Sequence, residues 1–74
     1  MRISKRLIRR VADNLSKRGT FTQEDVHAKI EEILGRALDS NEKRRITLIL
    51  RNEYVLEKVE RDTQNGGQRI FYFL

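Results

Sequence analysis

The sequence predicts an α+β fold in which three helices are followed by a small antiparallel sheet. Three observations predict it. Apolar residues recur at three- and four-residue steps in three successive segments, and after residue 53 the pattern changes to β-branched and aromatic residues. The four glycines, Gly19, Gly35, Gly66 and Gly67, all lie between these segments, where helix C-termini and tight turns use positive φ angles. We take the 74 residues as one domain, 1–74.

The first helix is expected over about residues 3–18, ahead of Gly19. Its apolar stripe comprises Ile3, Leu7, Ile8, Val11, Ala12 and Leu15. Its opposite face carries Lys5, Arg6, Arg9 and Arg10. These cations either extend a contact with a polyanion or only keep the chain in solution, and the sequence leaves both alternatives open.

The second helix is expected to begin after a short strand at residues 20–22. Thr22 suits the N-cap position, and Asp25 lies three residues later, as in a capping box. The helix is expected to end at Gly35 and to carry acidic residues on its solvent face. Its buried stripe is expected to comprise Val26, Ile30, Ile33 and Leu34.

The third helix has its own capping signal, because Asp39 is followed three residues later by Glu42, so we expect the helix to begin near Ser40. Three apolar residues point to the core: Ile46, Ile49 and Leu50. Helical angles place Asn41, Arg44, Leu48 and Arg51 on the far side, flanked by Arg45 and Thr47.

Two strands are expected over residues 54–62 and 69–74. Both are rich in β-branched and aromatic residues, and the loop between them contains Asn65-Gly66, a strong signal for a hairpin turn. The predicted order is therefore helix, short strand, helix, helix, strand, loop, strand.

Composition narrows the classes of function. The formal net charge of +5, from 16 Lys and Arg against 11 Asp and Glu, favours a polyanionic partner. The chain has no cysteine and no apolar run near the roughly 18 residues that span a bilayer. We therefore expect a soluble, intracellular, cytoplasmic protein without membrane contact.

Neither the single histidine nor the acidic residues form a catalytic or metal-binding pattern. His27 lies just off the apolar stripe of the second helix, and the adjacent Glu31 and Glu32 point to different sides. No phosphate-binding or dinucleotide-binding motif occurs either. We expect no enzymatic activity, no cofactor, no metal site and no small-molecule ligand.

Two helices joined by a glycine-containing turn and followed by a hairpin resemble the winged helix-turn-helix family of DNA-binding proteins. The helix-turn-helix corresponds to residues 22–52 and the wing to residues 54–74. The run Tyr54-Val55-Leu56 resembles the step into the first wing strand, although many members have Gly where this chain has Tyr54, and Gly66-Gly67 resembles the wing tip. In its small size the chain also resembles the single-domain regulators of archaeal plasmids and viruses. The resemblance implies sequence-specific binding of double-stranded DNA in transcription regulation, with the third helix in the major groove.

The face expected to read DNA belongs to the third helix. Arg44 and Arg51 suit the two acceptors of guanine, and Asn41 suits adenine. Thr47 and Leu48 suit thymine methyl groups. Contacts with phosphates or from the wing are expected from Lys43, Arg45, Thr22, Gln23, Arg61, Gln64 and Arg69.

Two parts of this interface stay open. Leu48 points outward by helical angle, but a slight rotation of the helix would bury it, and we favour the buried position. In the wing, Glu57, Glu60 and Asp62 lie close to Arg61 in the sequence. A purely structural hairpin is therefore as good an interpretation as insertion into a groove of DNA.

The last strand motivates an alternative function. If Ile70, Tyr72 and Leu74 meet the helices, Phe71 and Phe73 face outward, or the reverse, and some aromatic surface should be exposed. The alternative is a winged helix protein-interaction module in a nucleic-acid-processing assembly. A homodimer through the first helix or the sheet is a further expectation, because one recognition helix covers little DNA.

Overall fold

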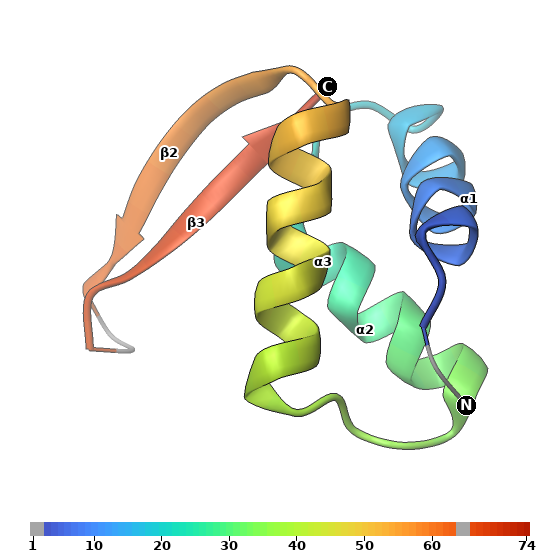
Figure 1. Ribbon diagram of the computed structural model, residues 1–74. Coiled ribbons are helices and arrows are strands. Elements are labelled where there is room, and N and C mark those ends of the chain that lie inside the picture. Colours follow the sequence, from blue (N-terminus) through green and yellow to red (C-terminus); the bar gives the residue numbers. More distant parts are fainter. Residues whose placement is uncertain (1–2, 64–65) are drawn as a thin grey trace.

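The computed structural model of the chain describes residues 3–63 and 66–74. In this part, three helices and a three-stranded antiparallel sheet follow in the order α1 (Lys5–Ser16), β1 (Phe21–Thr22), α2 (Gln23–Leu34), α3 (Ser40–Glu53), β2 (Leu56–Asp62) and β3 (Gln68–Phe73) (Figure 1). The predicted α+β class is confirmed. The β2–β3 hairpin projects beside α3, on the side away from α1 (Figure 1).

Capping explains where the helices begin. The side chain of Thr22 accepts a hydrogen bond from the N–H of Asp25, and Asp39 does the same for Glu42, so both predicted capping boxes are confirmed. The Arg36 guanidinium at 2.8 Å and the N–H of Asp39 lower the pKa of Glu42 to about 2. The carboxylate therefore stays ionised, as its capping role requires.

The first helix is shorter than predicted at both ends. It begins at Lys5 because Ser4 caps it, accepting a hydrogen bond from the N–H of Leu7 at 3.1 Å. It ends at Ser16, and the predicted last residues, Lys17 and Arg18, belong to the following turn. No helix within residues 3–63 and 66–74 is long and apolar enough to cross a membrane.

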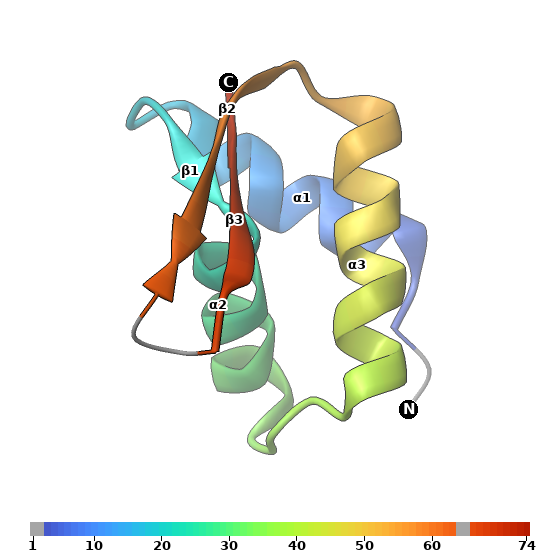
Figure 2. The same ribbon diagram turned by 90° about the vertical axis from the view of Figure 1, so that its left-hand side faces the viewer.

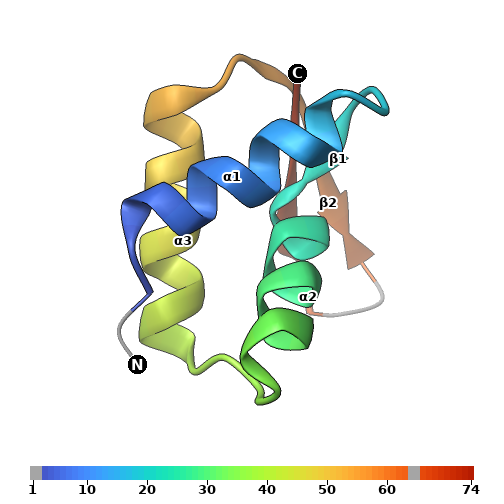
Figure 3. The same ribbon diagram turned by 90° about the vertical axis from the view of Figure 1, so that its right-hand side faces the viewer.

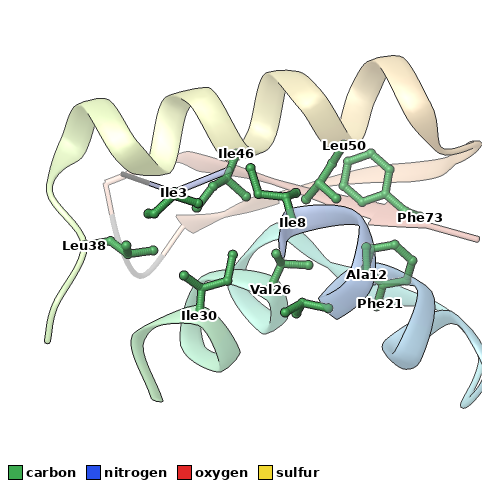
Figure 4. Packing of buried hydrophobic residues seen from close by; sticks show 11 residues of the cluster. Ile3, Ile8, Ala12, Phe21, Val26, Ile30, Leu38, Ile46, Leu50 and Phe73 are labelled. Atoms are coloured by element: carbon green, nitrogen blue, oxygen red, sulfur yellow. The ribbon is translucent and has the colours of Figure 1, made fainter. Parts of the chain in front are cut away.

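The core lies where the three helices meet the sheet (Figure 4). Its buried residues are Ile3, Ile8, Val11, Ala12, Phe21, Val26, Ile30, Leu38, Ile46, Leu50 and Phe73. Ile49 packs against this cluster as predicted. The prediction for Ile33 is wrong, because its side chain is 52% exposed at the rim of a groove between α1 and α2.

The sheet has β3 in its centre, with β1 on one side and β2 on the other. Phe21 of β1 pairs with Phe73, and their rings lie 5.7 Å apart between centroids. Phe73 is completely buried and Phe71 packs against the core, so this side of the last strand meets the helices. Ile70 and Tyr72 alternate with these residues and lie on the opposite face of the sheet. Of the two alternatives for the last strand, the one in which Phe71 and Phe73 meet the helices is therefore right.

Tyr54 joins α3 to the sheet and packs onto α1. Its ring meets that of Phe21 edge to face, with the centroids 5.4 Å apart, and its hydroxyl donates to the carboxylate of Asp13. Burial is the main cause that raises the pKa of Tyr54. A glycine here would leave this corner of the core unfilled, which explains why an aromatic residue stands at this position.

Candidate nucleic-acid interface

A groove of about 1040 Å³ lies between α2, α3 and β3. Figure 2 shows these elements on the side where the hairpin faces the viewer. Six residues of α3 and β3 give the groove its chemistry: Lys43, Arg44, Thr47, Leu48, Arg51 and Arg69. Four of the six carry a positive charge. On the α2 side the groove is lined by Glu24 and Glu31, and the carboxylate of Glu31 accepts a hydrogen bond from the N–H of Leu38.

The exposed stripe of α3 faces this groove. Arg44, Leu48 and Arg51 follow one another at spacings of four and three residues, which places them on one face of a helix. Leu48 is 52% exposed, so the favoured prediction of a buried side chain is wrong and the outward direction given by helical angle is right. Arg44 forms no ion pair or side-chain hydrogen bond within the described residues, so its guanidinium can bind a ligand.

Arg51 forms the upper end of the stripe. Its guanidinium carbon lies 5.1 Å from the centroid of the Phe71 ring, a cation–π contact that joins α3 to β3. Phe71 was not among the residues predicted for this site, because its direction depended on which face of the last strand met the helices.

One backbone carbonyl group, that of Lys43, joins two side chains that line the groove. The carbonyl oxygen of Lys43 accepts hydrogen bonds from the Thr47 hydroxyl at 3.0 Å and from Nε2 of His27 at 3.2 Å. Burial is the largest cause lowering the pKa of His27, so its ring stays neutral at physiological pH and holds α2 against α3. His27 is therefore structural here, and the hydroxyl proton of Thr47 is already engaged.

The hairpin sorts its charges onto two faces. Arg61 and Arg69 are direct cross-strand partners, so both side chains leave the hairpin on the face that carries Phe71 and looks toward α3. Glu60 pairs with Ile70 on the other face, where it binds Lys58 at 2.9 Å. Glu60 therefore does not lie between the two arginines.

Hydroxyl groups also bind two of the nearby carboxylates, those of Glu57 and Glu60. The hydroxyl of Tyr72 donates to Glu60 at 3.1 Å, and the hydroxyl of Thr20 donates to Glu57 at 2.7 Å. The pKa of Glu60 is lowered, chiefly by its hydrogen bond with Lys58. The hairpin thus presents a cationic face toward the groove even though its sequence is nearly neutral.

Two predicted residues of α3 lie on a different side. Asn41 and Arg45 line a small hollow with Ile3, away from the groove. The guanidinium of Arg45 donates to the backbone carbonyl of Ile3 and so fastens the N-terminal segment to α3. The structure therefore divides the predicted α3 face into two parts. Gln64 lies outside the described residues.

Some of the cations on the basic face of α1 form ion pairs with another residue of the chain. Glu53 of α3 binds Lys5 at 2.9 Å and Arg9 at 2.8 Å, and these contacts lower its pKa. Arg6 and Arg10 form no ion pair in the part of the chain that the structure describes. Two of the four cations on this face thus serve to hold α1 against α3.

At the start of α2, the structure corrects the prediction for Gln23. Its side chain is buried, its Nε2 donates to the carbonyl of Arg69 at 2.8 Å, and its Oε1 accepts from the N–H of Phe71 at 2.8 Å. Since Thr22 pairs with Tyr72 in the sheet, the amide of Gln23 continues the β1 side of the ladder by one more residue. It is not presented to a phosphate. The hydroxyl of Thr22 caps α2, and its side chain is half-buried.

Replacement of Gln23 by Ala is expected to lower the free energy of unfolding by about 1–3 kcal/mol, because two backbone groups of β3 lose their partner. Urea unfolding of the full chain measures this. The neighbouring Glu24→Ala is the matched control, since Glu24 is exposed and the change should stay within about 0.5 kcal/mol. Equal stability of the two variants would contradict the role assigned to the amide.

The described residues contain no cluster of three or more His, Asp or Glu side chains that could hold a metal ion. No family model, no curated protein and no solved structure matches the chain.

Proposed function

We propose that the chain is a winged helix-turn-helix protein that binds double-stranded DNA sequence-specifically and regulates transcription. In this proposal α2 and α3 form the helix-turn-helix, α3 enters the major groove, and the β2–β3 hairpin is the wing. One observation supports the proposal most: three cations of α3 and Arg69 of the hairpin line one groove, and Arg61 leaves the hairpin on the same face as Arg69, whereas Glu57 and Glu60 are bonded to other residues.

The dimensions of α3 suit the major groove. The groove of B-DNA is about 12 Å wide and admits a single α-helix, whose outward side chains reach the base edges. Arg44 and Arg51 are seven residues apart, which corresponds to roughly 10 Å along the helix axis. That distance equals about three base-pair steps of roughly 3.4 Å each. We therefore expect guanines about three base pairs apart in the preferred site, with Leu48 suited to a thymine methyl between them.

The cations around this stripe suit the sugar-phosphate backbone. Lys43 lies on the flank of α3 nearest to α2, and Arg61 and Arg69 approach from the wing. Three phosphate contacts predict a slope of roughly −3 when the logarithm of the binding constant is plotted against the logarithm of salt concentration. Duplex binding by the full chain across a salt series is the direct test. No binding at low salt would contradict the proposal.

Base preference should depend on Arg44. In a selection from a random duplex pool, Arg44→Ala is expected to lose preference for guanine at one position, equivalent to about 1–3 kcal/mol. The matched control is Arg45→Ala on the same helix, whose guanidinium is turned toward Ile3 and should leave the selected sequence unchanged. If both variants relax the same position, or neither does, α3 does not read bases through this stripe.

The alternative of a protein-interaction module that uses the aromatic face of the last strand has less support. Phe73 is completely buried, and Phe71 packs against the core beneath Arg51. The aromatic surface that motivated this alternative therefore faces the helices.

A further inference from the structure

A second groove lies between α1 and α2 and has a different character. It encloses about 260 Å³, and its apolar surface is formed by Leu7, Val11 and Leu15 of α1 and by Ile33 of α2. Figure 3 shows the two helices on the side of the molecule where the hairpin lies behind them. This α1–α2 groove shares no lining residue with the groove beside α3. An occupant of one groove therefore need not displace an occupant of the other.

Ile33 is the feature of this groove that the fold does not explain. It continues the apolar stripe of α2, yet its side chain is 52% exposed, whereas Val26 and Ile30 on the same stripe are completely buried. A large apolar side chain at the mouth of an apolar hollow is typical of a surface that a partner covers.

The rim of the groove carries three cations: Arg10, Arg18 and Lys29. Lys29 lies 3.6 Å from the carboxylate of Glu32, and both side chains are largely exposed. Arg10 and Arg18 form no ion pair among the residues that the structure describes. The groove is thus apolar within and basic at its edge, which complements a ligand with apolar anchors and acidic flanks.

The size and charge of the groove favour one occupant over others. Its volume is below the roughly 300–1,000 Å³ of pockets that enclose small molecules. A second copy of the chain in a two-fold contact would set Arg10 and Arg18 against their own counterparts. A helix of a partner protein can insert two apolar side chains one turn apart and place carboxylates over the rim.

We propose that the α1–α2 groove binds an amphipathic helical segment of a partner protein, one whose large apolar residues are flanked by Asp and Glu. The basis is the exposed Ile33 above an apolar floor with Arg10, Arg18 and Lys29 around it. This interaction is independent of DNA binding. A protein with both surfaces would hold its partner on DNA.

The test uses a displayed library of random peptides about 12 residues long, roughly three helical turns, selected against the full chain. Enriched peptides are expected to carry large apolar residues three or four positions apart together with Asp or Glu. For the synthesised consensus peptide, Ile33→Ser should raise the Kd at least about tenfold, and Arg10→Gln with Arg18→Gln about tenfold, roughly 1.4 kcal/mol in each case.

The matched control is Leu48→Ser, because Leu48 and Ile33 have the same exposed fraction, 52%. This control should leave peptide binding unchanged, and Ile33→Ser should leave duplex binding unchanged. Since Ile33 is half exposed, its variant should keep the circular dichroism spectrum of the parent chain.

Three outcomes would overturn the proposal. The first is that enriched peptides bind the Ile33→Ser variant as tightly as the parent chain. The second is that dodecanoate displaces the consensus peptide, and the third is that the chain sediments as a dimer that Ile33→Ser dissociates. The second would identify the groove as a fatty-acid site and the third as a contact between copies. Failure of duplex binding with intact peptide binding would overturn the proposed function alone.

Discussion

Replacing Arg61 and Arg69 together by Gln is expected to weaken duplex binding by roughly 60-fold at 0.1 M salt and to reduce the magnitude of the salt slope by about 2. Each phosphate contact releases counterions, and the binding constant changes by about 0.9 logarithmic units for each tenfold change in salt. The two side chains leave the same face of the hairpin at directly opposed positions. In the proposed complex they can therefore clamp neighbouring phosphates at the edge of the major groove.

The same double variant should be at least as stable as the parent chain. Like charges directly opposite each other across two antiparallel strands are destabilising, so removing both relieves repulsion in the free protein. Loss of binding without loss of stability would distinguish ligand-binding residues from residues that hold the fold together. Urea unfolding and duplex titration of the same preparations measure both quantities.

The control for the Arg61 and Arg69 double variant removes two positive charges at other positions. Arg6 lies on α1 and Lys17 directly follows this helix; both are exposed, and neither lines the groove beside α3. Arg6→Gln with Lys17→Gln should cost much less affinity than the hairpin variant. Equal losses would mean that only the net charge of the chain attracts DNA, and the wing would have no specific contact.

The largest effect on stability is expected from Phe73→Ala. Its ring is completely buried against Phe21 in the middle strand of the sheet, and such replacements cost about 3–5 kcal/mol. A domain of this length has roughly 4–11 kcal/mol of stability in total. The melting temperature should therefore fall by roughly 12–40 °C, as circular dichroism would measure.

Leu74→Ala provides the control for Phe73, because the next residue is 54% exposed and its truncation should change stability by about 0.5 kcal/mol at most. Phe73→Leu should fall between the two, since it keeps most of the apolar volume. A cost below about 1 kcal/mol for Phe73→Ala would mean that this face of the last strand does not close the core.

The order and class of the elements could be predicted because their signals are local. Thr22 with Asp25, and Asp39 with Glu42, determine where two helices begin through hydrogen bonds that span three residues. Gly35 ends α2 with φ at 71°, a conformation that costs glycine little. Each of these signals is complete within one turn of the chain, so no knowledge of the tertiary structure was needed.

The directions of individual side chains could not be predicted as well. Helical angle gives the side of a helix on which Ile33 and Leu48 lie, but it does not say where the neighbouring element ends. Ile33 is exposed because it lies at the mouth of the α1–α2 groove, and Leu48 because the groove beside α3 is open. Burial at such positions depends on packing between segments that are distant in sequence.

The candidate site was predicted only in part, because it too depends on contacts between segments that are distant in sequence. The cations of α3 and the hairpin were expected to act together, and four of them line one groove. The long side chains of Arg45 and Gln23 instead form hydrogen bonds with residues distant in sequence. Arg45 binds the carbonyl of Ile3, and Gln23 binds the backbone of β3. The position of Arg61 directly opposite Arg69 depends on the register of the hairpin, which the sequence alone did not give.

Strand β2 has no neighbour on its outer side among the described residues, so it is an edge strand with unpaired backbone groups. Such edges invite pairing with other chains and lead to aggregation. This one is protected in two ways: its register shifts between Leu56 and Lys58, and charged residues such as Glu57 and Glu60 recur along it. The carboxylates that contribute nothing favourable to a DNA contact thus have a use of their own. They oppose the pairing of this exposed strand edge with another chain.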